Sequence, residues 1–285
     1  MVLRRLARRA VAPPVAPPVS VLMSLLMALL MAVAVAGLAG CGGGRPATGG
    51  AADGTAESAE GAAKEVTVFA AASLTGSFTE LGRAFEAAHP GTSVRFNFGS
   101  SATLAQQIVQ GAPADVFAAA SPATMETVTD AGRAGPPVTF ARNTLRIAVP
   151  AGNPAGVEEL KDLADPAVKV ALCAEQVPCG AAAAKALDAA GLAVRPVTLE
   201  QDVKATLTKV ELGEVDAALV YRTDVIASAG KVEGIAFPEA DQAVNDYPIA
   251  ALTGAPAGPL ARRFVDLVLS QPGKDALTKA GFETP

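Results

Sequence analysis

The order of apolar and polar positions from residue 66 onward predicts a repeated succession of strand, turn and helix. Residues 66–69 (VTVF) suit a strand that is buried on both faces. Small residues follow at 70–73 (AAAS), and from Leu74 to Ala88 the apolar side chains recur at helical spacing. Residues 94–98 then alternate between apolar and polar, which predicts a second strand.

Both of these predicted strands lead through small residues and a serine into the start of a helix. Ser73 stands at the first junction, and Ser101, preceded by Gly99 and Ser100, stands at the second. A helix start presents unpaired N–H groups and a positive dipole end, so it can hold an anion without any cation. A lone serine at such a place is more often an ordinary cap. The recurrence favours a ligand site, because open α/β sheets bind ligands at the carboxyl ends of their strands.

Further along, the same alternation predicts a second lobe. Residues 143–150 (NTLRIAVP) are expected to form a strand that crosses into this lobe, and residues 247–252 a strand that returns from it. Between and after them we predict strands at 168–172 and 217–221 and helices at 180–190, 202–212, 259–270 and 274–280. The fold class is therefore α/β, with lobe 1 formed by residues 65–143 and 247–285 and lobe 2 by residues 144–246.

The N-terminal residues 1–40 have the pattern of an export signal. Four arginines precede an apolar run from Val19 to Leu38, and the sequence Leu38-Ala-Gly-Cys41 follows. This stretch resembles the lipobox of bacterial lipoproteins, in which the cysteine is lipidated and becomes the new N-terminus. An uncleaved membrane anchor is the alternative, because twenty apolar residues can span a bilayer. The sequence leaves open whether export follows the general secretory or the twin-arginine route.

Residues 42–64 hold almost no large apolar side chain and are expected to form a flexible tether after Cys41. A flexible coil of 23 residues reaches about 25 to 30 Å on average. We therefore expect a folded body that is held at the extracytoplasmic face of the cell membrane.

The charge balance excludes some partners. The whole chain carries a formal net charge of −5, and all four arginines of residues 1–40 belong to the expected signal, so the remainder has 19 basic against 28 acidic residues. Nucleic acids and anionic membrane surfaces both reward clustered lysine and arginine, so neither is expected to bind this body directly. A small anion held by dipoles remains compatible with the acidic surface.

Enzyme chemistry finds little support in the sequence. A serine nucleophile at Ser73 needs a base, and the single histidine, His89, is expected about 20 Å away at the far end of the intervening helix. One histidine and scattered carboxylates offer no cluster for a bare metal cation, and no glycine-rich phosphate loop is present. A tethered serine hydrolase stays as a remote alternative, and we expect no cofactor.

Six separated motifs together resemble the molybdate-binding proteins of bacterial ABC importers, a branch of the type II periplasmic binding proteins. The motifs are VTVFAAASL (66–74), FGSSATLAQQI (98–108), GAPADVF (111–117), EQVPCG (175–180), EQDVKATLTKVELGEVDAALVY (200–221) and the YP pair (247–248). The resemblance implies two lobes, each a central, mainly parallel sheet flanked by helices, with the ligand in the cleft between them. It also implies capture of molybdate and tungstate, delivery to an ABC permease, and a monomer.

Matching the family's motifs to this sequence implies five ligand-binding residues. They are Ser73, Ser101, Cys179, Val203 and Tyr221. Ser100 is the alternative to Ser101 if the second motif is matched one position earlier. The serines and the tyrosine would bring hydroxyls, whereas Cys179 and Val203 would present main-chain N–H groups at helix starts. Sulfate or another tetrahedral oxyanion is the alternative ligand.

This sequence departs from its apparent relatives at Cys179, where they commonly carry alanine. The change creates a pair with Cys173. Outside the cytoplasm two such cysteines can close a disulfide, and two buried thiols are the alternative.

Overall fold

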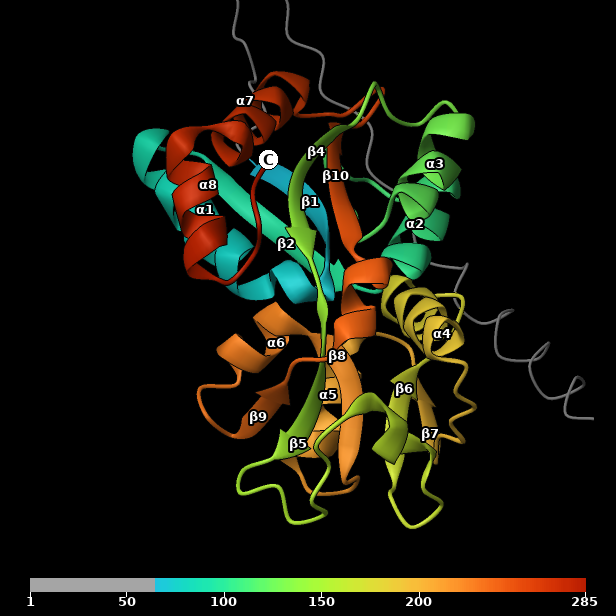
Figure 1. The fold of residues 1–285 in the computed structure, drawn as a ribbon. Helices are drawn as coiled ribbons and strands as arrows, with labels where there is room; N and C mark the ends of the chain where they lie inside the picture. The colour runs from blue at the N-terminus through green and yellow to red at the C-terminus, as the bar shows by residue number, and fades with distance from the viewer. Residues whose placement is uncertain (1–64) are drawn as a thin grey trace, which may run out of the picture. The chain divides into compact units, whose positions relative to one another are not determined.

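The computed structural model describes residues 65–285, which contain two five-stranded sheets with helices packed against them (Figure 1). The expected signal peptide (residues 1–40), Cys41 and the tether (residues 42–64) lie outside the described residues. From residue 65 onward, no helix is long and apolar enough to cross a membrane. Below, lobe 1 and lobe 2 denote the parts built on the first and the second sheet.

Lobe 1 draws its strands from both ends of the described chain. Its strand order is β2 (Ser93–Gly99), β1 (Glu65–Ala71), β3 (Val116–Ala118), β10 (Asn245–Ala251) and β4 (Val138–Asn143). On one side of the sheet lie α1 (Thr75–Ala88), α7 (Gly258–Leu269) and α8 (Gln271–Lys279), and on the other lie α2 (Ser101–Val109) and α3 (Pro122–Asp130) (Figure 1). Helices on both faces explain why β1 is an almost continuous apolar run.

An aromatic cluster holds the C-terminal helices on this sheet. The ring of Phe78 from α1 lies 5.8 Å from Phe140 on β4 and 5.9 Å from Phe264 on α7, measured between centroids. Phe264 and Val268 are fully buried in the same core. The prediction that these helices pack back onto lobe 1 is therefore confirmed.

Lobe 2 has the strand order β7 (Thr198–Glu200), β6 (Val170–Cys173), β8 (Ala217–Tyr221), β5 (Leu145–Pro150) and β9 (Val232–Ile235). Its helices are α4 (Pro178–Ala190), α5 (Val203–Glu211) and α6 (Arg222–Ala227), with short 3-10 helices η3 (Leu160–Ala164) and η4 (Pro238–Ala243). Gly191 follows the end of α4 and Gly213 lies just beyond α5, both at positive φ, as the sequence predicts.

The sheets are mixed, which corrects the expectation that each is mainly parallel. In lobe 1, β1 pairs in parallel with β2 and β3, but β10 runs antiparallel to both β3 and β4. In lobe 2, β6 pairs in parallel with β7 and β8, but β5 runs antiparallel to β8 and β9. The antiparallel pairs all involve β10 or β5, the strands that begin where the chain enters each lobe from the other.

The predicted crossing strand at 143–150 is in fact the meeting point of two strands. Strand β4 ends at Asn143 in the sheet of lobe 1, and β5 begins at Leu145 in the sheet of lobe 2. Strand β4 was not predicted, because it is an edge strand with exposed residues at its start and a register shift opposite Tyr247 and Pro248. The short strands β7 and β9 were missed as well.

Candidate ligand-binding site

Ser73 lies where β1 runs into its helix. The short 3-10 helix η2 (Ala72–Leu74) connects the carboxyl end of β1 to α1, and Ser73 is only 8% exposed within it. Its Oγ lies 2.9 Å from the Oη of Tyr247 on β10, and the pair forms a buried hydrogen bond. Small residues on either side of the turn leave space in front of the helix start, and the hydroxyl of Ser73 faces this space.

The second junction brings two serine hydroxyls to the same edge of the sheet. Strand β2 ends at Gly99, and Ser100 immediately precedes α2 without capping it through its side chain. The Oγ of Ser101 accepts a hydrogen bond from the N–H of Ala120 at 3.0 Å, which leaves its own proton free to donate. The Oγ of Ser100 is buried and has no hydrogen-bond partner within the described chain.

In lobe 2, Cys179 occupies the first turn of α4. Pro178 begins the helix, and the main-chain N–H of Cys179 has no partner among residues 65–285. Gly180 is required next to it, because a Cβ at that position would clash with the main-chain carbonyl of Ala174. The helix start therefore lies directly against the loop that follows β6.

Val203 begins α5 under an aspartate cap. The Oδ1 of Asp202 accepts hydrogen bonds from the N–H groups of Lys204 and Ala205, at 2.8 and 3.0 Å. The N–H of Val203 itself has no partner in the described chain. The cap thus pairs the second and third N–H groups of the helix and leaves the first one available.

Tyr221 ends β8 and has a fully buried phenol. Its Oη has no hydrogen-bond partner in the part of the chain that the structure describes. Burial raises the pKa of Tyr221 well above its ordinary value, so the group is a neutral donor at any physiological pH. A buried, unpaired hydroxyl is costly, and a ligand that accepts its hydrogen bond would remove the cost.

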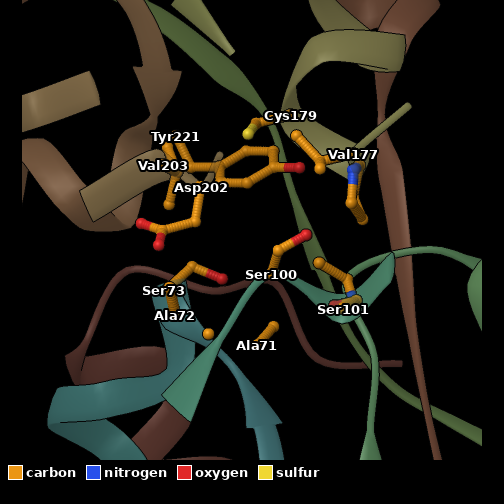
Figure 2. Close-up of a pocket in the computed structure, with 13 residues that line it drawn as sticks. Ala71, Ala72, Ser73, Ser100, Ser101, Val177, Cys179, Asp202, Val203 and Tyr221 are labelled. Carbon is orange, nitrogen blue, oxygen red and sulfur yellow. The ribbon is translucent and has the colours of Figure 1, made fainter. Parts of the chain in front are cut away.

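All five residues that the sequence analysis selected line one cavity (Figure 2). Its cavity volume is about 20 Å³, far below the range of about 300 to 1,000 Å³ that is typical for drug-sized ligands. The cavity therefore suits a small ligand. Its full lining is Ala71, Ala72, Ser73, Gly99, Ser100, Ser101, Ala120, Val177, Pro178, Cys179, Asp202, Val203 and Tyr221.

Neutral donors dominate this lining. No lysine, arginine or histidine belongs to it, and four helix starts, those of η2, α2, α4 and α5, contribute residues to it. The lining contains one ionisable carboxylate, Asp202, which the sequence analysis did not assign to the site. Its place at the start of the helix predicted at 202–212 was the signal, since an aspartate at a helix start is a typical cap. Hydroxyls and N–H groups at helix starts can hold an anion that only accepts hydrogen bonds.

A buried carboxylate lies behind the tyrosine. Asp224 on α6 is fully buried, and its Oδ2 accepts a hydrogen bond from the main-chain N–H of Tyr221 at 3.2 Å. Its Oδ1 lies at ion-pair distance, 3.3 Å, from the Nζ of Lys204, without hydrogen-bond geometry. Burial raises the pKa of Asp224 to about 6, although Lys204 opposes the shift.

A disulfide joins Cys173 at the end of β6 to Cys179 in the first turn of α4. The Sγ of Cys173 also lies 3.2 Å from the Oγ1 of Thr206 on α5. Two helix starts of the cavity wall are thereby attached to the same strand end.

Within residues 65–285, the single histidine does not lie beside Ser73. The Nδ1 of His89 lies 2.9 Å from the main-chain oxygen of Phe85, and the ring stacks on that phenylalanine beyond the last turn of α1. Ser73 lies before the first turn of the same helix. Across residues 65–285, no group of three or more His, Cys, Asp or Glu side chains is placed to hold a metal ion.

Comparison with known proteins supplies the family. The family model described as bacterial extracellular solute-binding protein matches residues 66–283. The chain belongs to this family. Solute-binding proteins of ABC transporters bind their ligand without transforming it, so this member is a binding protein and not a serine hydrolase.

Three similar proteins narrow the comparison. The molybdate-binding protein ModA of Mycobacterium tuberculosis (strain H37Rv) is 43% identical over 252 residues, covering 88% of this chain and 94% of that protein. The solved substrate-binding domain of a putative molybdenum ABC transporter from Clostridium difficile is 25% identical, with a TM-score of 0.60 over 78% of this chain and 99% of the other. The Azotobacter vinelandii periplasmic molybdate-binding protein, at 23% identity, covers 77% of this chain and 99% of its own with a TM-score of 0.69.

These likenesses confirm the two-lobed periplasmic-binding-protein fold that the motifs predict. They do not test the individual ligand contacts. The assignment of Ser73, Ser101, Cys179, Val203 and Tyr221 to a bound ligand therefore stays a prediction, supported by their common cavity.

Proposed function

We propose that this solute-binding protein captures molybdate outside the cytoplasm and delivers it to the transmembrane subunits of an ABC importer. The observation that carries the proposal is the cavity lined by hydroxyls and helix-start N–H groups without a single basic side chain. Molybdate at neutral pH is a fully deprotonated tetrahedral dianion, so it can only accept hydrogen bonds. A wall in which neutral donors predominate, with Asp202 as its one carboxylate, matches that chemistry.

The similar proteins support the choice of ion. The Mycobacterium tuberculosis relative, 43% identical and matched over 94% of its length, is named a molybdate-binding protein. Tungstate has the same charge and shape as molybdate, so the same donors would hold it. Sulfate has the same charge as molybdate but is smaller. The size of the cavity around the bound ion therefore determines whether sulfate binds.

We further propose that the protein acts as a lipid-anchored monomer. The Leu38-Ala-Gly-Cys41 sequence supports lipidation of Cys41 at the extracytoplasmic face of the cell membrane. Residues 42–64 would give the folded body a reach of about 25 to 30 Å toward its permease.

A thermal-shift panel tests the ligand assignment. The protein is melted with molybdate, tungstate, sulfate and phosphate at one ionic strength, beside a Ser73→Ala/Ser101→Ala control. At 100 times its dissociation constant, a ligand stabilises the native state by about 2.7 kcal/mol. Molybdate and tungstate should raise the melting temperature of the wild type. Phosphate should raise it less, because its remaining proton needs an acceptor and the one carboxylate of the lining, Asp202, already caps α5 through its Oδ1.

The control variant should lose most of the molybdate shift. Equal shifts for phosphate and molybdate in the wild type would overturn the assignment. A shift for sulfate as large as that for molybdate would instead identify a general receptor for tetrahedral dianions.

A further inference from the structure

A chain of buried hydrogen bonds runs from the junction of the two lobes to the cavity. Asn143, the last residue of β4, directs its Nδ2 to the Oγ1 of Thr223 at 2.9 Å and to the Oη of Tyr247 at 3.4 Å. The Oη of Tyr247 in turn lies 2.9 Å from the Oγ of Ser73. Tyr247 does not line the cavity, so its hydroxyl acts on a ligand only through Ser73.

The amide of Asn143 fixes the direction of the first hydrogen bond in this chain. The Oδ1 of Asn143 accepts from the main-chain N–H of Thr144 at 3.1 Å, which fixes which end of the amide faces Tyr247. Its Nδ2 carries two hydrogens and cannot accept, so Tyr247 accepts there. Either oxygen of the Tyr247–Ser73 pair can be the donor, and donation from Tyr247 is the polarity that also gives the buried phenol proton a partner.

Tyr247 keeps that proton at physiological pH. The residue is fully buried, and burial raises the pKa of its phenol far above the ordinary value, although hydrogen bonds with Ser73 and Asn143 oppose the shift. Donation from Tyr247 to Ser73 leaves the proton of the serine hydroxyl free for the cavity. The reverse polarity would use that proton up in the bond to Tyr247.

We propose that Tyr247, oriented by Asn143, is a positioning residue that keeps Ser73 in its donor state toward the bound oxyanion. This inference rests on the proposed function, because it requires an anion that accepts from Ser73. It adds a residue outside the cavity wall to the determinants of affinity. It also places one of those determinants at the junction between the lobes, where Asn143 ends β4 and reaches Thr223 of α6.

A double-mutant cycle measured by calorimetry with molybdate tests the relay. The four proteins are the wild type, Tyr247→Phe, Ser73→Ala and the double variant. Loss of the Tyr247 hydroxyl alone should weaken binding about three- to tenfold, because Ser73 is then free to turn its proton away. With Ser73 already replaced by alanine, Tyr247→Phe should change the dissociation constant by less than about twofold.

A purely structural role of Tyr247 would give a different cycle. The tyrosine ring packs 5.3 Å from Phe282 between centroids, so Phe282→Leu disturbs the same packing without touching the hydroxyl. Its effect on affinity should be the same in both Ser73 backgrounds. An equal effect of Tyr247→Phe in both backgrounds would overturn the relay.

The remaining outcomes separate the two proposals. If Tyr247→Phe does not fold, Asn143→Ala removes the donor to Tyr247 and should show the same dependence on Ser73; additivity there would equally overturn the relay. Wild-type protein that binds no molybdate would overturn the proposed function itself. Wild-type binding with an additive cycle would leave that function standing and reject the relay alone.

Discussion

Asn143 on β4 lies opposite Asn245 on β10, so the two strands that connect the lobes run side by side at their junction. Beyond this pair the chain continues through Thr144 into β5, and it arrives through Val244 from lobe 2. The Nδ2 of Asn245 donates to the main-chain oxygen of Ala120 at 2.7 Å and fixes the junction to lobe 1. Two adjacent single-residue connections form a narrow joint of the kind that allows hinge motion.

Binding should therefore draw the lobes together. Ser73 and Ser101 belong to lobe 1, whereas Cys179, Val203 and Tyr221 belong to lobe 2, and neither set alone surrounds a tetrahedral ion. We expect the radius of gyration from small-angle scattering to fall on addition of molybdate. Phosphate serves as the control ligand. Identical scattering curves with and without saturating molybdate would argue for a rigid cleft.

Replacing Tyr221 by phenylalanine should move affinity and stability in opposite directions. Its buried Oη has no partner within residues 65–285, so its loss should stabilise the ligand-free protein by about 1 kcal/mol. Loss of a hydrogen bond to a charged ligand costs about 1.5 to 3 kcal/mol, or about ten- to a hundredfold in affinity. Melting curves and calorimetry measure the two effects.

Tyr247→Phe is the matched control for that experiment. Its hydroxyl bonds Ser73 and Asn143, so its loss should destabilise the ligand-free protein instead. A Tyr221→Phe variant with unchanged affinity would remove this residue from the ligand contacts.

Asp202 should weaken binding of a dianion through its charge while it supports the helix that presents Val203. Asp202→Asn keeps a side-chain oxygen that can cap α5 and removes the negative charge from the cavity wall. We expect molybdate affinity to rise by about fivefold, on the order of 1 kcal/mol of relieved repulsion. Val203→Ala should change affinity little, because the proposed contact is its N–H. Calorimetry at low salt checks both, and weaker binding by Asp202→Asn would contradict the repulsive role.

The sequence predicted the parts of the site that local pattern controls. Ser73 and Ser101 could be placed because each follows a strand and opens a helix, and strand ends of one sheet meet at one edge. Cys179, Val203 and Tyr221 could be assigned only through the family resemblance, since their order along the chain does not reveal that they face the serines.

Features that depend on long-range pairing escaped the sequence. The hydrogen bond between Ser73 and Tyr247 joins residues 174 positions apart. Strand β4 was missed because its partner, β10, lies about a hundred residues later and the burial of its own residues does not alternate regularly. The antiparallel pairing of β10 with β3 and of β5 with β8 likewise follows from the passage of the chain between the lobes and not from any local pattern.

Asp224 should make the protein less stable as pH rises toward neutrality. Its pKa is about 6 in the folded protein and about 4 when the chain is unfolded, so the folded state binds more protons between these values. Stability then falls with increasing pH across this window, by about 3 kcal/mol in total. Asp224→Asn should raise the melting temperature at pH 7.5 and leave it unchanged near pH 3.5.

Lys204→Met provides the opposite control for this carboxylate. It removes the cation 3.3 Å from Asp224 and should lower stability at pH 7.5 more than at pH 3.5. If Asp224→Asn destabilised the protein equally at both pH values, the carboxylate would be acting through its cap on Tyr221 and not through its charge.

The disulfide should contribute stability without contributing a ligand contact. Cys173 and Cys179 are six residues apart, and closing so short a loop restricts the unfolded chain by about 2 kcal/mol. Because the proposed contact of Cys179 is its main-chain N–H, Cys173→Ala/Cys179→Ala should melt earlier yet bind molybdate within about threefold of the wild type. The reduced wild type should behave like the double variant in both measurements. A larger loss of affinity in the variant, with the melting temperature restored by excess molybdate, would show instead that the bond holds the first turn of α4 in its binding position.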